Sequence, residues 1–347
     1  MGIFRWGGMF MAEVKRNNVA IERMETLMHP EPPLAPVKKR HLSLAHPREI
    51  PLSIDRDSVE ALERLEVRGL CFRYDSVKQE KAQEDGEPSE EAAELTETSR
   101  ADEADRGSSG ELPLPFGIED ISFSVEGGSL VVVTGQIGSG KTTLLKSVIG
   151  ILPVQAGSVL WNGEEAPSGG KLERSRFWDA PRAAYTPQVP RLFSNTLREN
   201  VLLGIPEDKA DLAAAIRDAC LEADLAEMPA GLDTEIGPRG VRLSGGQVQR
   251  TAAARMFARG ARLMVLDDIS SALDVETEKT LWDRLLSSKG RATYLVASHR
   301  EALLRRADTI LLMHEGRLAA QGSFAELMLS SSLFRSLMKR EQHPELN

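Results

Sequence analysis

The chain has 347 residues, a formal net charge of −9 and two cysteines, Cys71 and Cys220. This length allows one to three domains with a large core, and the negative charge argues against a nucleic-acid partner. Two cysteines cannot form a disulfide framework or a metal cluster, which is typical of a reducing compartment. No apolar run reaches the length of a membrane span, and the sequence shows no signal-peptide cleavage pattern.

The N-terminal 64 residues have two predicted parts. Residues 1–28 start apolar and continue with charged residues at helical spacing, which predicts a helix. This helix is either an amphipathic helix packed on its own domain or the cytoplasmic end of a membrane helix that begins outside this sequence. Residues 29–64 are predicted to be a linker, because six prolines between positions 29 and 51 break any helix.

Residues 65–74 have the composition of a short strand that ends at Tyr74. Tyr74 is either a half-buried tyrosine at a strand end or a platform on which a purine base stacks. Residues 76–112 follow, with 12 Asp and Glu against 4 Lys and Arg and almost no apolar residues. They are predicted to be an acidic, disordered insertion, because they cannot bury enough surface to offset the entropy lost on ordering.

A glycine-rich loop is the strongest local signal. Residues 118–125 alternate as a strand does, and the apolar strand 130–133 leads into GQIGSGKTT at positions 135–143 and a helix over 144–149. Glycines allow several backbone N–H groups to point at one anion, and the helix N-terminus adds its partial positive charge. In this pattern Lys141 reaches the outer phosphates of a nucleotide and Thr142 supplies a hydroxyl for Mg²⁺.

The remaining elements alternate between strands and helices. Strands are expected at 157–163, 182–185, 263–266, 294–297 and 309–313, and helices at 276–286 and 301–306, with a largely helical stretch over 196–259. This alternation predicts an α/β fold with a mostly parallel sheet that a helical subdomain interrupts.

Further candidate residues follow the strands. The apolar strand 263–266 ends in Asp267 and Asp268, next to the phosphate loop if the sheet is parallel. Asp267 then holds Mg²⁺ and Asp268 polarises an attacking water, although Asp268 could also simply cap the next segment. Residues 243–247 (LSGGQ) precede a helix and could be an ordinary N-cap, and Gln188 and His299 are uninformative alone.

The order of these motifs resembles the nucleotide-binding domain of ABC (ATP-binding cassette) proteins over residues 65–342. The resemblance identifies residues 135–143 as the Walker A loop, Gln188 as the Q-loop glutamine, 243–247 as the signature motif, 263–268 as the Walker B strand, 271–274 as the D-loop and His299 as the switch histidine. It implies a P-loop fold with a mixed core sheet, an antiparallel β subdomain and a helical subdomain over 189–259, all within 65–347.

The resemblance also implies ATP and Mg²⁺ as cofactors. By the same resemblance, the catalytic residues are Asp268, His299 and Gln188, and the metal-binding residues are Thr142, Gln188 and Asp267. Nucleotide binding falls to Tyr74, Gly135, Gly138, Ser139, Gly140, Lys141, Thr142 and Thr143, and to Ser244, Gly245, Gly246 and Gln247 of a second cassette that faces the first head to tail.

Two segments resemble exporters in particular, residues 192–201 and residues 234–240, although proline stands at position 238 where exporters often have glutamate. We therefore expect an ATPase that drives an exporter at the cytoplasmic face of the cell membrane, with a transmembrane domain and a second cassette as partners. The membrane helices either precede Met1 or lie on another chain. The alternatives are a stand-alone soluble ABC ATPase that acts as a mechanical switch on a protein partner, and a nucleotide-sensing module without turnover.

The chain departs from the family at Asp268, where the catalytic residue is usually glutamate. Aspartate is one methylene shorter, and a displacement of ~1 Å can cost ~100-fold in rate. Hydrolysis at this Walker site is therefore expected to be slow, as in one half of a heterodimeric exporter with one strong and one weak site. A homodimer with two working aspartate sites is the alternative.

Overall fold

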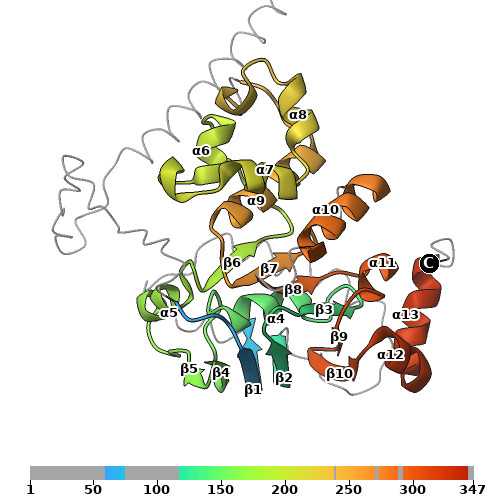
Figure 1. Cartoon of the computed structure of the whole chain (residues 1–347). Coiled ribbons are helices and arrows are strands. Elements are labelled where there is room, and N and C mark those ends of the chain that lie inside the picture. Colours follow the sequence, from blue (N-terminus) through green and yellow to red (C-terminus); the bar gives the residue numbers. More distant parts are fainter. Residues whose placement is uncertain (1–58, 75–116, 238–239, 270–272, 288–291, 343–347) are drawn as a thin grey trace, which may run out of the picture. The chain divides into compact units, whose positions relative to one another are not determined.

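The computed structural model describes residues 59–74, 117–237, 240–269, 273–287 and 292–342 (Figure 1). The chain divides into two units, residues 1–51 and 52–347, and the described residues all belong to the second. The predicted N-terminal helix (1–28), most of the predicted linker (29–64) and the predicted acidic insertion (76–112) lie outside the described residues.

The core of the second unit is a six-stranded sheet with the order β10-β9-β3-β8-β7-β6. Five strands are parallel and β10 joins β9 antiparallel, so the sheet is mixed. The strands are β3 (Leu130–Gly135), β6 (Ala183–Thr186), β7 (Leu263–Asp267), β8 (Thr293–Ala297), β9 (Thr309–His314) and β10 (Arg317–Gly322).

The central strands are buried on both faces, which explains their nearly continuous apolar sequences. Along β3, Leu130 and Val132 belong to one hydrophobic cluster, and Val131 and Val133 belong to another. The first cluster also contains side chains from the helices on one side of the sheet, and the second contains side chains from α4 (Lys141–Val148) and the smaller sheet on the other side. The core sheet is therefore the middle layer of three.

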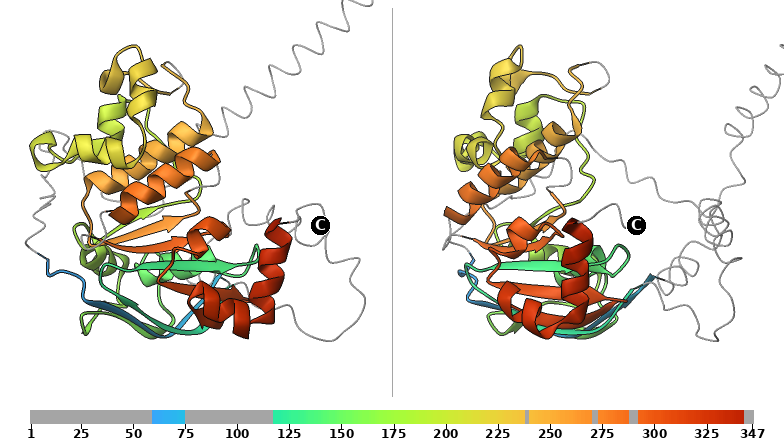
Figure 2. Two further views of the ribbon diagram at one scale, coloured as in Figure 1. Left: turned by 45° about the vertical axis from the view of Figure 1, so that its right-hand side comes forward. Right: turned by 90° about the vertical axis from the view of Figure 1, so that its right-hand side faces the viewer.

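The smaller sheet has four antiparallel strands in the order β2-β1-β4-β5. Its strands are β1 (Arg64–Arg73), β2 (Gly117–Glu126), β4 (Ala156–Trp161) and β5 (Glu164–Glu165). In both views of Figure 2 this sheet lies on one side of the core sheet, and α9 (Gly245–Ala258) and α10 (Val275–Ser287) lie on the other. The expected fold class is confirmed, with its mixed core sheet, antiparallel β subdomain and helical subdomain.

The described end of the predicted linker is part of this packing. Leu62 is buried in the cluster beneath the smaller sheet. The side chain of Asn162 accepts from the backbone N–H groups of Glu63 and Arg64 and donates to the carbonyl of Ala61. Residues 61–64 are thus held against the end of β4 before β1 begins.

The helical segment after β6 contains several short helices and one long one. They are α6 (Leu197–Leu202), α7 (Leu212–Asp218), α8 (Glu222–Glu227) and α9, with 3₁₀ turns at Glu207–Lys209 and Gly231–Asp233. Between the second turn and α9, the described residues 234–237 and 240–244 carry no helix, so the expectation of a largely helical run does not hold there.

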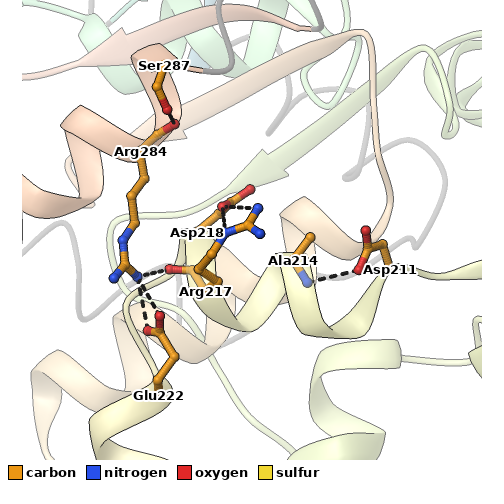
Figure 3. A network of polar contacts seen from close by, with 7 residues as sticks. All are labelled: Asp211, Ala214, Arg217, Asp218, Glu222, Arg284 and Ser287. Carbon is orange, nitrogen blue, oxygen red and sulfur yellow. Dashed lines mark hydrogen bonds and ion pairs between the residues drawn. The ribbon is translucent and has the colours of Figure 1, made fainter.

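The helix α10 is joined to this helical segment by polar contacts (Figure 3). The guanidinium of Arg284 donates to both carboxylate oxygens of Glu222 in α8, at 2.9 and 3.0 Å, and to the carbonyl of Arg217 in α7. The side chain of Asp211 accepts from the N–H of Ala214 and so caps the start of α7. These contacts tie three helices together at the surface.

Several elements were not expected from the sequence. They are β5, β10, α5 (Lys171–Trp178), α12 (Phe324–Ser330) and α13 (Ser332–Gln342). In α13, Phe334 and Met338 are four positions apart and both lie in the core. The helix α11 (Glu301–Leu304) is shorter than the expected helix 301–306.

Asn200 links the loop before α6 to α9. Its side chain is 1 % exposed, accepts from the N–H of Phe193 and the guanidinium of Arg255, and donates to the carbonyls of Phe193 and Thr196. A buried amide that makes four hydrogen bonds fixes the path of the chain, because the loop before α6 and the Arg255 side chain of α9 both bond to it.

We predict that Asn200→Ala lowers the free energy of unfolding by about 2–3 kcal/mol, since it removes the four hydrogen bonds of a side chain that is 1 % exposed. Urea denaturation followed by circular dichroism measures this change. Asn195→Ala is the matched control, because Asn195 is exposed and makes backbone hydrogen bonds in the described structure. Equal stability of the two variants would contradict the prediction.

Candidate functional site

The site lies where three neighbouring parallel strands end. In the register of the sheet, Asp267 at the end of β7 pairs with Ala297 at the end of β8, and Ala297 also pairs with Val133 near the end of β3. The segments that follow these strands therefore emerge at one edge of the sheet, where ligands of parallel α/β sheets bind.

The loop after β3 has the backbone shape that an anion requires. Gly135, Gly138 and Gly140 all have positive φ angles. An added Cβ at Gly135 would lie 2.2 Å from the carbonyl oxygen of Met313, whereas at Gly138 it would meet no atom within 4 Å. Gly135 thus allows a close approach between β3 and β9, and Gly138 leaves open space in the loop.

The helix that follows the loop begins without a side-chain cap. Gly140 is the N-cap of α4, no side chain caps it, and the first turn holds no acidic residue. The N–H groups and partial positive charge of this helix end are thus directed at the loop. Ser139 is buried, and its hydroxyl has no hydrogen-bond partner within the described part of the chain. These features fit a bound phosphate.

The ammonium of Lys141 folds back over the loop. It donates to the carbonyl oxygens of Gly135 and Gln136 at 2.9 and 2.8 Å. Burial lowers the pKa of Lys141, and the nearby Asp267 and Asp268 oppose this effect. A cation in this position adds charge to the backbone cradle.

Asp267 is the buried acid of the site, with 3 % of its surface exposed. Its Oδ1 accepts from the hydroxyl of Thr142 at 3.0 Å, and its Oδ2 accepts from the hydroxyl of Tyr185 at 3.1 Å. Burial raises the pKa of the Asp267 carboxyl, while these two hydrogen bonds act in the opposite direction. The carboxylate is thus held between the phosphate loop and β6.

Asp268 follows in the left-handed region with φ of 50°, a conformation that aspartate adopts more readily than most residues. Its Oδ2 accepts from the side chain of Gln188 at 3.2 Å, and its N–H donates to the carbonyl of Ala297. His299 is exposed and follows β8. These residues lie around a cleft of ≈ 380 Å³, whose lining comprises Ile137, Gly138, Gly140, Lys141, Thr142, Thr143, Gln188, Asp267, Asp268, Ala297, Ser298 and His299.

Tyr74 lies beside the phosphate loop. Its hydroxyl is 3.1 Å from the hydroxyl of Thr143, and its ring packs edge-on against Phe72 with centroids 4.9 Å apart. The side chain remains 40 % exposed. A partly exposed aromatic ring anchored at the loop is compatible with stacking on a base.

The signature motif lies elsewhere in this chain. Ser244 is the N-cap of α9, its hydroxyl accepts from the N–H of Gln247, and the side chain of Gln247 accepts from the N–H of Ser244. Ser244 and Gly245 are exposed, Gly246 and Gln247 are partly exposed, and none of the four lines the cleft. The structure thus gathers the Walker, Q-loop and switch residues and leaves the signature residues apart from them.

Two functional-site neighbours were missed from the sequence. Asp224 in α8 accepts from the side chain of Gln247 and forms a partly buried ion pair with Arg250 at 2.7 Å. Tyr185 contacts Asp267. The position of Tyr185 near the end of β6 and three residues before Gln188 could have indicated it; nothing in the sequence indicates which helix Asp224 faces.

A phosphate-binding loop between a parallel strand and a helix, with an aspartate at the end of a neighbouring strand, defines a P-loop nucleotide-binding protein. Residues 118–271 match the family described as ABC transporter. This match, together with the fold and the relatives described next, identifies an ABC exporter nucleotide-binding domain within the chain.

The relatives are an ABC transporter and a flippase by name. The chain is 36% identical over 230 residues to the probable multidrug resistance ABC transporter ATP-binding/permease protein YheI of Bacillus subtilis. The aligned region covers 65% of this chain and 38% of that protein. It is 38% identical over 227 residues to an ATP-dependent lipid A-core flippase of Pseudomonas fluorescens. The aligned region covers 63% of this chain and 36% of that protein.

The structure is similar to that of a bacterial Atm1-family ABC exporter with ATP bound, with a TM-score of 0.63 and 25% identity. The match covers 82% of this chain and 42% of the exporter chain. This chain thus spans less than half the length of the proteins to which it is similar. Among the described residues, no helix combines the length and apolar character that crossing a membrane requires.

The two loop glycines provide a matched test of the loop geometry. We predict that Gly135→Ala lowers the free energy of unfolding by more than about 2 kcal/mol, because the new methyl group collides with a backbone carbonyl. Gly138→Ala, which meets only the cost of a positive φ, should lower it by about 1 kcal/mol. Urea denaturation without nucleotide gives both values, and a larger loss for Gly138→Ala would contradict the loop geometry.

Proposed function

We propose that the chain binds and hydrolyses ATP and thereby drives transport by an export-type ABC transporter at the cytoplasmic face of the cell membrane. The observation that carries the proposal is the separation of the two phosphate-directed motifs. The Walker residues line the cleft, and Ser244 and Gly245 are exposed at the start of a different helix. A triphosphate held from two sides therefore needs the signature helix of a second cassette.

The proposed roles follow from position. The loop from Gly135 to Thr143 cradles the phosphates, and Lys141 leaves its two carbonyl partners to contact them. Tyr74 presents its ring to the adenine. Asp268 orients the attacking water, and Gln188 and His299 face the same cleft from neighbouring segments. The start of α9, from Ser244 to Gln247, serves the site of the partner cassette.

The residues present also fit Mg²⁺. Among the described residues, no three His, Cys, Asp or Glu side chains gather as a metal site. Mg²⁺ is commonly bound by one or two carboxylates together with substrate phosphates, so this donor set suits a cation that arrives with the nucleotide. Thr142 and Asp267 would hold it, with Gln188 at the edge of the cleft. When bound, Mg²⁺ neutralises phosphate charge and polarises the transferring phosphoryl group.

The proposed membrane partner has a place to dock. A groove of ≈ 530 Å³ lies between the segment after Gln188 and the segment before α9, with the lining Leu192, Phe193, Ile236, Gly237, Gly240, Val241, Arg242, Leu243 and Val248. The side chain of Phe193 is 57 % exposed there. We propose that an intracellular helix of the transmembrane domain occupies this groove, which would couple Gln188 and the signature helix to the membrane domain.

The same proposal includes a slow Walker site. The carboxylate of Asp268 lies within hydrogen-bond distance of Gln188, and its side chain is one methylene shorter than glutamate. This supports a heterodimer in which the chain contributes an intact signature motif to the stronger site of its partner. A homodimer is the alternative arrangement.

We predict that ATP and Mg²⁺ drive pairing of cassettes through the signature helix. In an Asp268→Asn background, which prevents turnover, light scattering after gel filtration should show the mass of a cassette pair. Gly245→Asp should abolish pairing yet retain ATP binding, because the added carboxylate repels the partner's triphosphate. Gly170→Asp, at the exposed start of α5, is the control. Pairing that survives Gly245→Asp would overturn the head-to-tail arrangement.

We also predict that Asp268→Glu raises ATP turnover by about 10- to 100-fold, since the longer side chain restores the reach of the base. The measurement is phosphate release by the chain together with the membrane subunits with which it copurifies. Asp268→Asn should abolish the activity of this site, and Asp208→Glu, at an exposed position, should leave it unchanged. Brisk wild-type turnover that Asp268→Glu fails to increase would refute the slow-site proposal.

A further inference from the structure

We propose that Tyr185 is a positioning residue that holds the Asp267 carboxylate in the orientation in which it receives Mg²⁺. This inference rests on the proposed function, in which ATP and Mg²⁺ bind together in the cleft. Tyr185 is not itself part of the cleft lining, so it acts through Asp267.

The sheet places the two residues side by side. The strand β6 pairs with β7 in parallel, and Tyr185 lies opposite Val265, two positions before Asp267. Successive side chains alternate between the faces of a strand, so Val265 and Asp267 start from the same face of β7. The long side chain of Tyr185 spans the remaining distance, and its hydroxyl lies 3.1 Å from Oδ2.

Each oxygen of the Asp267 carboxylate accepts from a different side chain. Thr142, which belongs to the phosphate loop, donates to Oδ1, and Tyr185, which belongs to the edge strand of the sheet, donates to Oδ2. A carboxylate that is 3 % exposed and fixed at both oxygens cannot rotate without losing a buried hydrogen bond. The carboxylate plane is therefore set before any metal arrives.

The protonation states agree with these roles. Burial raises the pKa of the Tyr185 phenol, and the charge of Asp267 and the hydrogen bond to it raise the pKa further. The phenol is thus a permanent O–H donor at neutral pH. It can donate to Oδ2 in every state in which Asp267 is ionised and able to accept.

Orientation matters for this particular ion. Mg²⁺ demands near-ideal octahedral geometry and tolerates little displacement of its ligands. Groups that hydrogen-bond to metal ligands typically contribute 10- to 100-fold to metal affinity. Loss of the Tyr185 hydroxyl would leave Oδ2 without its donor and free the carboxylate to rotate about its last torsion.

The test compares metal binding with nucleotide binding in the full-length chain. Mn²⁺ replaces Mg²⁺ as the probe, and electron paramagnetic resonance measures its dissociation constant in the presence of saturating ATP. We expect Tyr185→Phe to weaken Mn²⁺ binding by about 10-fold. Binding of a fluorescent ATP analogue in EDTA should change by less than about twofold, because the variant keeps the ring and the phosphate loop.

Tyr294→Phe is the matched control. Tyr294 lies in the core sheet as Tyr185 does, on β8, where it is buried, and it does not line the cleft. The charge that acts on its hydroxyl is that of Asp218 in α7 rather than that of Asp267. The control should bind Mn²⁺ as the wild-type chain does.

Two outcomes would overturn the inference while the proposed function stands. One is wild-type affinity for Mn²⁺ in Tyr185→Phe. The other is an equal loss of nucleotide binding with and without metal, together with a lower melting temperature, which would assign Tyr185 a purely structural role. Failure of the wild-type chain to bind ATP at all would instead overturn the proposed function, and the inference with it.

Discussion

The structure depends on the burial of a parallel sheet on both faces. Because β3, β7 and β8 are covered on each side, their side chains are apolar in both directions, and polar residues can occur only where the strands end. Parallel pairing brings these ends to one edge. The phosphate loop, Asp267 and the segment before His299 meet there for this reason, although the 154 residues from 144 to 297 separate Thr143 from Ser298.

The cost of burying polar groups shapes the site that results. The Asp267 carboxylate, the Lys141 ammonium and the Gln188 side chain all have protein partners within the described structure. An unpaired charge in such surroundings would be strongly unfavourable. These three side chains of the cleft thus have partners within the chain, and Lys141 would exchange carbonyl partners for phosphate oxygens when a nucleotide enters.

The helical segment keeps the signature motif apart from the cleft, although the helix of that motif contacts Gln188. Residues 188 and 249 are in contact, since the side chain of Gln249 donates to the carbonyl of Gln188, and Asn200 joins the same region to Arg255. The start of α9 nevertheless does not line the cleft of its own chain. One rigid helix thereby connects the groove proposed for the membrane domain with the surface proposed for the second cassette.

The sequence alone determined the phosphate loop, the buried strands and the α/β class, because glycine spacing and apolar runs are local signals that tertiary packing does not alter. The elements β10, α12 and α13 were not predicted from the sequence. Their mixture of polar and apolar residues can be assigned to an element only when the residues that pack on the core are known. Only the tertiary structure decided that Asp267 is shared by Thr142 and Tyr185, that Asp224 holds the signature helix, and that this helix lies outside the cleft. These facts depend on contacts between residues far apart in the chain, and such contacts follow from strand order and helix packing rather than from any local pattern.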